Sequence, residues 1–303
     1  MPIYVESFIR APMDELWDKT QNPRFHTAWD LRFSEISYLP RTDESEPQSF
    51  LYRTRIGFGL DIAGQGESRG EHQASSGTRT SALRFWSNDP KSLIVEGSGY
   101  WKYTPETGGI RFVTVYDYRP RFGAAGRIFD FLAFRPLIAW ATAWSFDRLR
   151  LWLEKGLDPA ASRERLLVHW TARWALALIW IYQGLVPKLL FPESGELATL
   201  RASPFFSGNA RAMLAVLGIA EIIFGLLHLA GRPSRFVLTM DFVALSILLM
   251  VGTVISSGQI LIAPFNAPTL TVGMLALAAI ALMTWRDLPS ARNTVWSSRR
   301  SPK

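Results

Sequence analysis

Five polar residues that could do chemistry lie in or at the ends of long apolar runs in the second half of the chain: Gln183, Lys188, Glu221, His228 and Asp241. Glu221 lies near the middle of its run, where a charge costs about 2.5–3.5 kcal/mol on membrane-insertion scales. His228 follows seven residues later, on the same helical face two turns away. Two interpretations stay open. These groups either pair and hold helices together, or form a polar site for a headgroup, a quinone or a proton.

Their positions along the apolar runs place these residues in two layers. Gln183 and Glu221 are expected near the membrane midplane, with Lys188 reaching back from the outer side. The inner layer, for which we favour the purely structural interpretation, contains His169, Arg173, His228 and Asp241. Because proline lacks an N–H, Pro187 is expected to kink the outer turn and to free a carbonyl near Gln183 for Lys188 or a ligand.

The first 160 residues hold titratable side chains without a spacing that compels catalysis: His26, Glu67, Glu71, His72 and Asp117. Each is interpreted as a surface charge or a member of a local ion pair. With no nucleophile–base arrangement, the catalytic residues stay unknown and we expect a protein that is not an enzyme. An enzyme acting on an apolar substrate remains an alternative.

Composition narrows the chemistry further. The absence of cysteine excludes disulfides, thiolate metal sites and c-type haem attachment in this chain. We expect no metal site and no covalently bound cofactor. The net charge of +7 lies entirely in residues 161–303, since the first 160 residues carry equal numbers of acidic and basic groups. This excess flanks apolar segments, which favours a lipid bilayer and argues against nucleic acid as a partner.

The first half of the chain has the alternation and turn residues of an antiparallel sheet. Short helices are expected after Ala11 and around residues 24–30, and a long helix over Pro136–Lys155, with Gly156 as its C-terminal signal. The expected strands are Ile3–Ile9, Arg32–Tyr38, Ser49–Ile56, Leu60–Gln65, Thr78–Trp86, Leu93–Tyr103 and Gly109–Tyr118. This order predicts an α+β helix-grip fold, a curved antiparallel sheet on a long C-terminal helix.

The stretches IRAPMDELWDKTQNPRFHTAWD and TVYDYRPRFG, in this order of elements, resemble the START-like superfamily (SRPBCC, polyketide cyclase/dehydrase and lipid transport) over about residues 1–155. The resemblance implies an elongated apolar pocket between sheet and helix. The number of large aromatic residues also suggests that some of them enclose a cavity, although each taken singly fits an ordinary core. The candidate lining residues are Trp86, Trp101, Tyr116, Tyr118, Trp140 and Trp144.

Four apolar runs are long enough to cross most of a bilayer: residues 174–191, 212–230, 236–256 and 269–285. The N-terminus lacks a signal-peptide apolar region, so we expect the first domain to stay in the cytoplasm. The basic residues expected on that side are Arg163, Arg165, Arg173, Arg232, Arg235, Arg286, Arg292, Arg299, Arg300 and Lys303. The opposite side has Lys188, Arg201 and Arg211, which predicts both termini inside the cytoplasmic membrane.

The run WIYQGLVPK from Trp180 to Lys188, followed by AEIIFGLLHL and four spans in total, resembles the DoxX-like family over about residues 165–288. Glu221 and His228 lie where that family's intramembrane polar residues are expected. The resemblance implies a membrane subunit that is linked to an oxidoreductase system, including quinone-reducing ones.

These expectations divide the chain into a START-like domain at 1–156, a linker at 157–165, a DoxX-like membrane domain at 166–288 and a basic tail at 289–303. We expect a membrane-anchored binding protein whose soluble pocket holds an apolar ligand (lipid, isoprenoid or quinone) beside an all-α four-span bundle. The alternatives are a quinone-linked accessory subunit of a membrane oxidoreductase and a structural or assembly subunit.

Overall fold

The computed structural model describes residues 1–41, 43, 46–57, 59–193, 195–202, 207–230, 235–262 and 266–298. Arg232, Arg299, Arg300 and Lys303, which entered the predicted charge asymmetry, lie outside these residues. Two compact units divide the chain. Unit 1 contains Met1–Ser162 with Pro289–Lys303, and unit 2 contains Arg163–Leu288.

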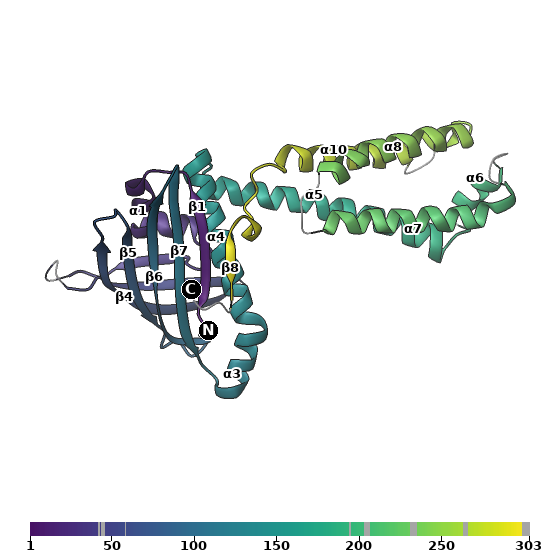
Figure 1. Cartoon of the computed structure of the whole chain (residues 1–303). Coiled ribbons are helices and arrows are strands. Elements are labelled where there is room, and N and C mark those ends of the chain that lie inside the picture. Colours follow the sequence, from purple (N-terminus) through teal and green to yellow (C-terminus); the bar gives the residue numbers. More distant parts are fainter. Residues whose placement is uncertain are drawn as a thin grey trace. The chain divides into compact units, whose positions relative to one another are not determined.

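Unit 1 is built on one antiparallel sheet in the order β2-β3-β4-β5-β6-β7-β1-β8 (Figure 1). Consecutive strands from β2 to β7 are neighbours, as in a meander, and β1 closes on β7 with Ile3 opposite Tyr116. Gly108, at φ +83, makes the turn between β6 and β7. The strands are β1 Ile3–Ile9, β2 Glu35–Tyr38, β3 Ser49–Gly57, β4 Leu60–Gln73, β5 Arg79–Trp86, β6 Ile94–Glu106, β7 Gly109–Pro120 and β8 Val295–Ser297.

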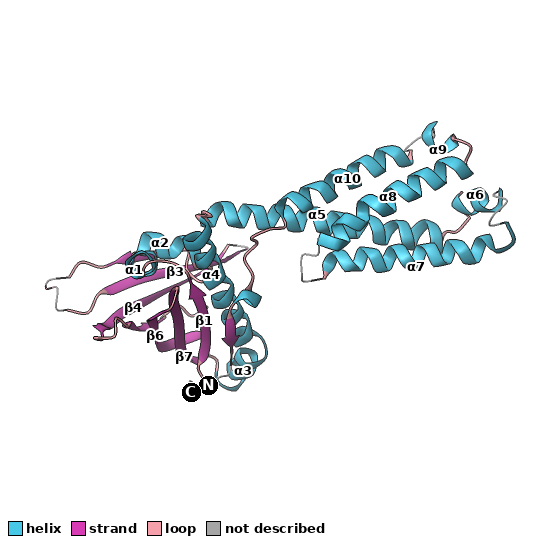
Figure 2. Cartoon of the chain, turned by 45° about the horizontal axis from the view of Figure 1, so that its top comes forward, coloured by secondary structure: helices cyan, strands magenta, loops and turns pink. Residues whose placement is uncertain are grey.

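The long helix α4, Arg135–Lys155, packs against β1 and ends at Gly156 in the left-handed conformation. Helices α1 (Met13–Gln21) and α2 (Pro23–Trp29) precede the meander (Figure 2). The helix α3 (Gly123–Phe129) and the π-helical turn η1 (Asp130–Phe134) lead directly into α4. The predicted helix-grip fold is therefore confirmed.

Residues 289–298, the described part of the expected basic tail at 289–303, fold with unit 1. The 3₁₀ turn η4 (Ala291–Asn293) precedes β8, which pairs with the edge of β1. The carboxylate of Asp147, completely buried on α4, accepts hydrogen bonds from Ser290 N and Asn293 Nδ2, each at 2.8 Å. A buried carboxylate needs such donors, which explains why the segment is held in place.

The expected linker at 157–165 is mostly helical. The helix α5 begins at Pro159, and the Asp158 side chain accepts a hydrogen bond from Ala160 N at 2.8 Å. Aspartate at the N-cap followed by proline in the first turn is a strong helix-start signal, so helix replaces linker from Pro159 onward.

Unit 2 contains mostly apolar helices. Within the described ranges, three of them combine the length and the hydropathy needed to cross a membrane: α7, α8 and α10. The helical elements are α5 Pro159–Leu185, the π-helical turn η2 Val186–Leu190, α6 Glu196–Ala202, the 3₁₀ turn η3 Ser207–Asn209, α7 Ala210–Leu229, α8 Arg235–Ile255, α9 Gln259–Ile262 and α10 Ala267–Thr284.

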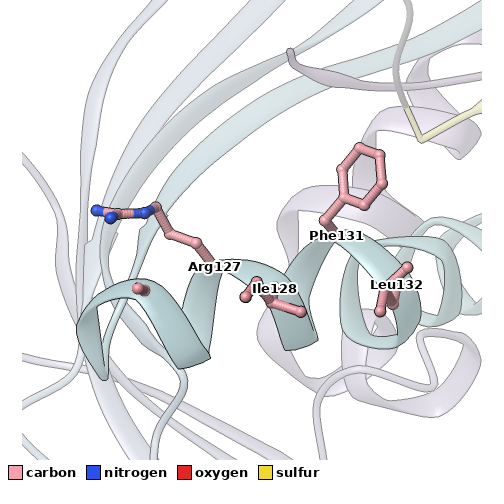
Figure 3. A pocket seen from close by; sticks show the side chains of 5 residues that line it. Arg127, Ile128, Phe131 and Leu132 are labelled. Atoms are coloured by element: carbon pink, nitrogen blue, oxygen red, sulfur yellow. The ribbon is translucent and has the colours of Figure 1, made fainter.

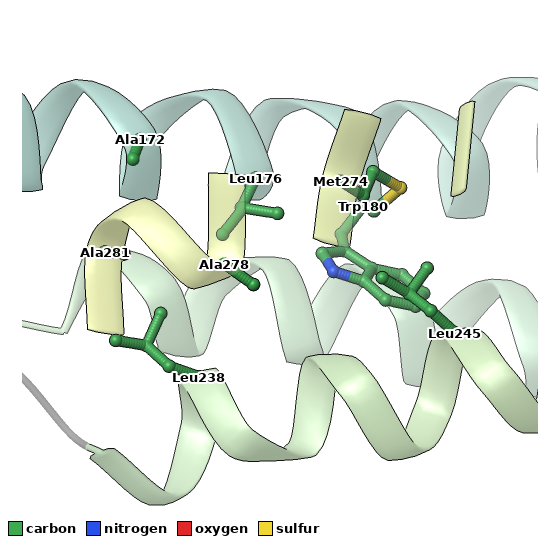
Figure 4. Close-up of a cluster of buried hydrophobic side chains, with 8 residues drawn as sticks. All are labelled: Ala172, Leu176, Trp180, Leu238, Leu245, Met274, Ala278 and Ala281. Carbon is green, nitrogen blue, oxygen red and sulfur yellow. The ribbon is translucent and has the colours of Figure 1, made fainter. Parts of the chain in front are cut away.

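One buried cluster joins α5, α8 and α10 (Figure 4). It contains no charged side chain, so its packing depends on shape and dispersion. Its members are Ala172, Leu176, Trp180, Leu238, Leu245, Met274, Ala278 and Ala281.

Candidate functional site

An ion pair lies inside unit 2, between η2 and α7. Lys188 Nζ lies 2.9 Å from Glu221 Oε2, and both side chains are buried. The same ammonium lies 3.1 Å from Glu196 Oε2 and 3.1 Å from the carbonyl oxygen of Gln183. Lys188 Nζ donates hydrogen bonds to the Gln183 carbonyl and to Glu196 Oε1, and it pairs with Glu221 through their opposite charges. We call these four residues the lysine cluster.

Local sequence places the ammonium there. Pro187 has no N–H, so the carbonyl of Gln183 four residues earlier loses its helical donor. The chain passes into the π-helical turn η2, and Lys188 Nζ donates to this freed carbonyl. Gln183 thus contributes a backbone oxygen to the lysine cluster.

A second polar group crosses three helices. Asp241 on α8 accepts a hydrogen bond from Trp180 Nε1 on α5 at 2.9 Å and lies 2.9 Å from His228 Nε2 on α7. His228 and Asp241 are completely buried, and Trp180 nearly so. We call these three residues the histidine cluster.

Both ring nitrogens of His228 have a polar neighbour. Its Nδ1 lies 3.0 Å from the carbonyl oxygen of Phe224, one turn earlier on α7. Its Nε2 lies 2.9 Å from Asp241 Oδ2 on α8. The imidazole thus links α7 to α8 inside unit 2.

The two clusters share one face of α7. Its buried residues recur at helical spacing: Ala210, Leu214, Gly218, Glu221, Gly225 and His228. Glu221 and His228 are therefore about 10 Å apart along the helix axis, at about 1.5 Å per residue. The five predicted polar residues thus lie in two groups, with Gln183, Lys188 and Glu221 in one and His228 and Asp241 in the other.

Glycines bring α5 and α7 close enough for these contacts. A Cβ added at Gly184 would lie 2.4 Å from the carbonyl oxygen of Gly218, and one at Gly225 would lie 2.9 Å from that of Ala177. Small residues are the usual means by which membrane helices approach closely. Trp180 and Glu196, which complete the clusters, were not predicted as site residues, because neither is unusual in its own sequence context.

The inner-layer residues His169 and Arg173 also lie buried on α5. His169 Nδ1 lies 3.0 Å from the carbonyl oxygen of Ala281, and Arg173 donates to that of Ala230 at 2.9 Å. These bonds tie α5 to the ends of α10 and α7, which is the structural role favoured for this layer.

The predicted aromatic residues of unit 1 have different surroundings. Trp101 belongs to a packed core with Trp29, Phe112 and Phe146, whose ring centroids lie 4.4–6.2 Å apart. Trp140 is 41% exposed on α4, so it lies outside any enclosed space. Trp144, Tyr116 and Tyr118 are buried, and Trp86 is half-buried.

An aromatic surface covers β3–β6 and is joined to the packed core through Phe33 and His26. The rings of Phe50, Tyr52 and Phe85 lie over glycines of the neighbouring strand, since a Cβ at Gly66, Gly64 or Gly97 would lie within 2.1–2.4 Å of them. Rings lying over glycines form a flat apolar surface, which we call the aromatic floor. Burial raises the pKa of Tyr52 to about 12.

A buried polar network lies between α2 and β7. Asp30 Oδ2 lies 2.6 Å from an Arg32 guanidinium nitrogen and 3.0 Å from His26 Nε2. Arg32 also lies over the Tyr116 ring at 5.4 Å, and the Tyr116 hydroxyl hydrogen-bonds Thr142 at 2.8 Å. His26 was among the residues predicted from the sequence, whereas Asp30 and Arg32 were not. An acidic and a basic residue close together beside aromatic residues could have indicated this buried pair.

Burial alone would raise the pKa of Asp30. The charge of Arg32 and the hydrogen bonds from His26 and Arg32 outweigh that effect and hold the pKa of Asp30 below its usual range. The carboxylate is therefore ionised, and it holds a cationic guanidinium at the end of the apolar interior. The other titratable candidates make local pairs, as with Glu67 to Arg69 at 2.9 Å and Asp117 to Arg135 at 2.8 Å, while Glu71 and His72 are exposed on β4.

Comparisons with known proteins agree with this division. The profile of the DoxX-like family matches residues 177–279. YndG of Bacillus subtilis (strain 168), described as an uncharacterized membrane protein, is 48% identical over 184 residues, which cover 60% of this chain and 68% of YndG. That match is longer than either Met1–Ser162 or Arg163–Leu288, so it includes residues of both units.

Several solved structures resemble the N-terminal region. The STAR-related lipid transfer protein of Xanthomonas axonopodis is 15% identical, with 50% of this chain and 85% of that chain covered and a TM-score of 0.39. The Zhui aromatase/cyclase of Streptomyces sp. R1128 is 13% identical, with 46% and 87% covered and a TM-score of 0.35. The relationship to YndG shows that the chain belongs to the same family of membrane proteins, and residues 177–279 form a DoxX-like region within it.

Proposed function

We propose that this protein binds an apolar ligand, a lipid, isoprenoid or quinone, over the aromatic floor of unit 1, beside the membrane that holds unit 2. The observation that carries the proposal is the floor itself. Phe50, Tyr52 and Phe85 are only half-buried, although they lie on the same sheet as the closely packed core around Phe112. Mostly apolar surfaces with a few placed polar groups are typical of small-molecule sites.

The polar end of such a ligand has a partner in Arg32. Its guanidinium is held by Asp30 and lies against Tyr116 at one edge of the apolar interior. A ligand with an apolar tail and an oxygen-bearing head would place the tail over Phe50 and Phe85 and accept a hydrogen bond from Arg32 or the Tyr116 hydroxyl. Attachment to a membrane helix keeps the site at high effective concentration near the ligand's source.

Lipid extraction tests the proposal. Delipidated full-length protein, incubated with liposomes containing fluorescent phospholipid and ubiquinone and then re-isolated, should carry one of the two. Protein re-isolated with neither phospholipid nor ubiquinone bound would contradict the proposal.

We further propose four spans with both termini cytoplasmic, α5 with η2 being the fourth. Pairing of β8 with β1 supports this topology, because chain segments before and after the spans then belong to one folded unit on one side of the membrane. If both ends of the chain lie on one side, the number of membrane crossings must be even. The helices α7, α8 and α10 supply three crossings, so α5 with η2 is proposed as the fourth.

The absence of cysteine makes the topology directly testable. A Ser257→Cys variant, between α8 and α9, should react with a membrane-impermeant maleimide in intact cells. A Ser75→Cys variant in unit 1 should react only after permeabilisation. The reverse pattern, or reaction of both in intact cells, would contradict the topology.

A second candidate is a quinone-linked accessory role beside a membrane oxidoreductase, favoured by the buried polar group of His228 and Asp241, whose facing atoms lie 2.9 Å apart. A quinone bound between α5, α7 and α8 could exchange protons with this pair. Quinone binding by purified protein should then weaken in Glu221→Ala and Asp241→Asn variants. Unchanged binding in both variants would remove this candidate.

A further inference from the structure

Unit 1 exposes a run of large apolar side chains between the end of β7 and the first turns of α4. Ile128 is 60% exposed and Leu132 is 68% exposed. Large contiguous apolar surfaces on folded domains usually mark interaction sites. We call the run the apolar ridge; it contains Phe122, Ile128, Phe129, Phe131, Leu132, Leu137 and Trp140.

The apolar ridge is firmly built into the fold. Asp130, the first residue of η1, is buried and accepts hydrogen bonds from Tyr118 Oη at 2.5 Å and Arg135 Nε at 2.9 Å. A Cβ added at Gly126 would lie 1.7 Å from the carbonyl oxygen of Arg121, so α3 turns tightly against the end of β7. The ridge is therefore presented by a fixed, hydrogen-bonded segment.

The exposed charge within the segment that carries the ridge is basic. From Arg119 to Phe146 the sequence has a single acidic residue, Asp130, which is buried and paired. Arg127 is exposed and lies beside Ile128 and Phe131, with which it lines a shallow pocket of about 400 Å³ (Figure 3). Large apolar and aromatic side chains with an adjacent arginine are the composition of segments that lie in the interface of anionic membranes.

Charge also decides against a second copy of the chain as the occupant. A two-fold interface would place ridge against ridge, with the same residues on both sides. Arg127 of each copy would then meet the segment from Arg119 to Phe146 of the other copy, whose single carboxylate, Asp130, is buried. An anionic lipid surface supplies both the apolar layer and the opposite charge.

We propose that the apolar ridge inserts into the interfacial layer of an anionic bilayer, so that unit 1 contacts the membrane at a place separate from the spans of unit 2. This contact does not depend on ligand binding by the aromatic floor. It would hold unit 1 in one orientation at the bilayer surface.

Spin labels on single cysteines test the proposal in the full chain. Ile128→Cys, Phe131→Cys and the control Ser75→Cys, an exposed turn residue, are labelled and reconstituted in phosphatidylcholine vesicles with and without phosphatidylglycerol. Labels at 128 and 131 should be several-fold more accessible to oxygen than to a water-soluble nickel chelate, while the control shows the reverse. Phosphatidylglycerol should raise the ratio of oxygen to nickel accessibility at position 131. In Phe131→Cys protein that also carries Arg127→Glu, this increase should disappear.

Nickel accessibility at 128 and 131 equal to that of the control would overturn the proposal. Spin–spin broadening at 131 that disappears on dilution with unlabelled protein would also overturn it, by showing a second copy on the ridge. Far-UV circular dichroism and the thermal midpoint of each variant show whether unit 1 remains folded.

Discussion

At the residue scale, Lys188 and Glu221 form a buried pair whose members depend on each other. Removing one partner leaves an uncompensated charge, at a cost of about 3–5 kcal/mol for buried pairs, whereas replacing both by apolar residues is often nearly neutral. The third partner, Glu196, is half-exposed and contributes less.

We therefore predict that Lys188→Met and Glu221→Leu each lower the thermal midpoint of the detergent-solubilised protein strongly. The double variant should recover most of the loss, because no unpaired charge remains. A double variant that loses the sum of the two single effects would show that the residues act independently.

The Asp30 network predicts a pH dependence for unit 1. The pKa of Asp30 in the folded state lies below that of an unfolded aspartate, about 3.9. The stabilisation is thus complete above about pH 4 and is lost as the pH falls further, when the unfolded state binds the proton first.

An Asp30→Asn variant should be less stable than the parent at neutral pH, by about 3 kcal/mol for a broken buried pair, and should lose less stability on acidification. Thermal unfolding followed by tryptophan fluorescence from neutral to acidic pH measures this. Asp14→Asn, which changes an exposed carboxylate, should keep the parent's acid-dependent loss. Parallel curves for parent and Asp30→Asn would contradict the assignment.

At the element scale, contact between α5 and α7 positions both polar clusters. Gly184 and Gly218 meet backbone to backbone, so an added methyl group has no space without separating the helices. Gly273 on α10 has open space at the same position and serves as a matched control.

Gly184→Ala should destabilise the solubilised protein by about 1–3 kcal/mol through overpacking. Gly273→Ala should be neutral or stabilising by up to about 1 kcal/mol, since alanine is the better helix former. Equal thermal midpoints for the two variants would show that α5 and α7 are farther apart than described.

The sequence predicted those elements whose signals are local. Alternating strands, turn residues and the glycine at position 156 that ends the long helix predicted the helix-grip order. The seven-residue spacing of Glu221 and His228 predicted that both lie on one face of a helix. The strand β8 escaped prediction, because Val295–Ser297 is too short to show alternation and depends on the distant edge of β1. Asp241 and Trp180 meet only through tertiary packing, which no local pattern encodes.

At the scale of the whole molecule, β8 and η4 return the chain to unit 1 after the last membrane helix. Asp147 holds the returning segment through the hydrogen bonds it accepts from Ser290 and Asn293. We predict that Asp147→Ala lowers the thermal midpoint of unit 1 and exposes residues 289–298 to proteolysis, detected by mass spectrometry of the fragments. Unchanged protection would contradict the anchoring role.

The central claim is that unit 1 of this membrane protein with a DoxX-like region holds an apolar ligand over its aromatic floor. Native mass spectrometry of detergent-solubilised full-length protein tests it most directly. The parent and Arg84→Ala, a change on the opposite face of β5, should carry a bound lipid, isoprenoid or quinone. Leu83→Trp, which adds bulk on the same face of β5 as Phe85, should lose it while keeping its fold. Parent protein without a bound molecule, or equal occupancy in Leu83→Trp, would contradict the claim.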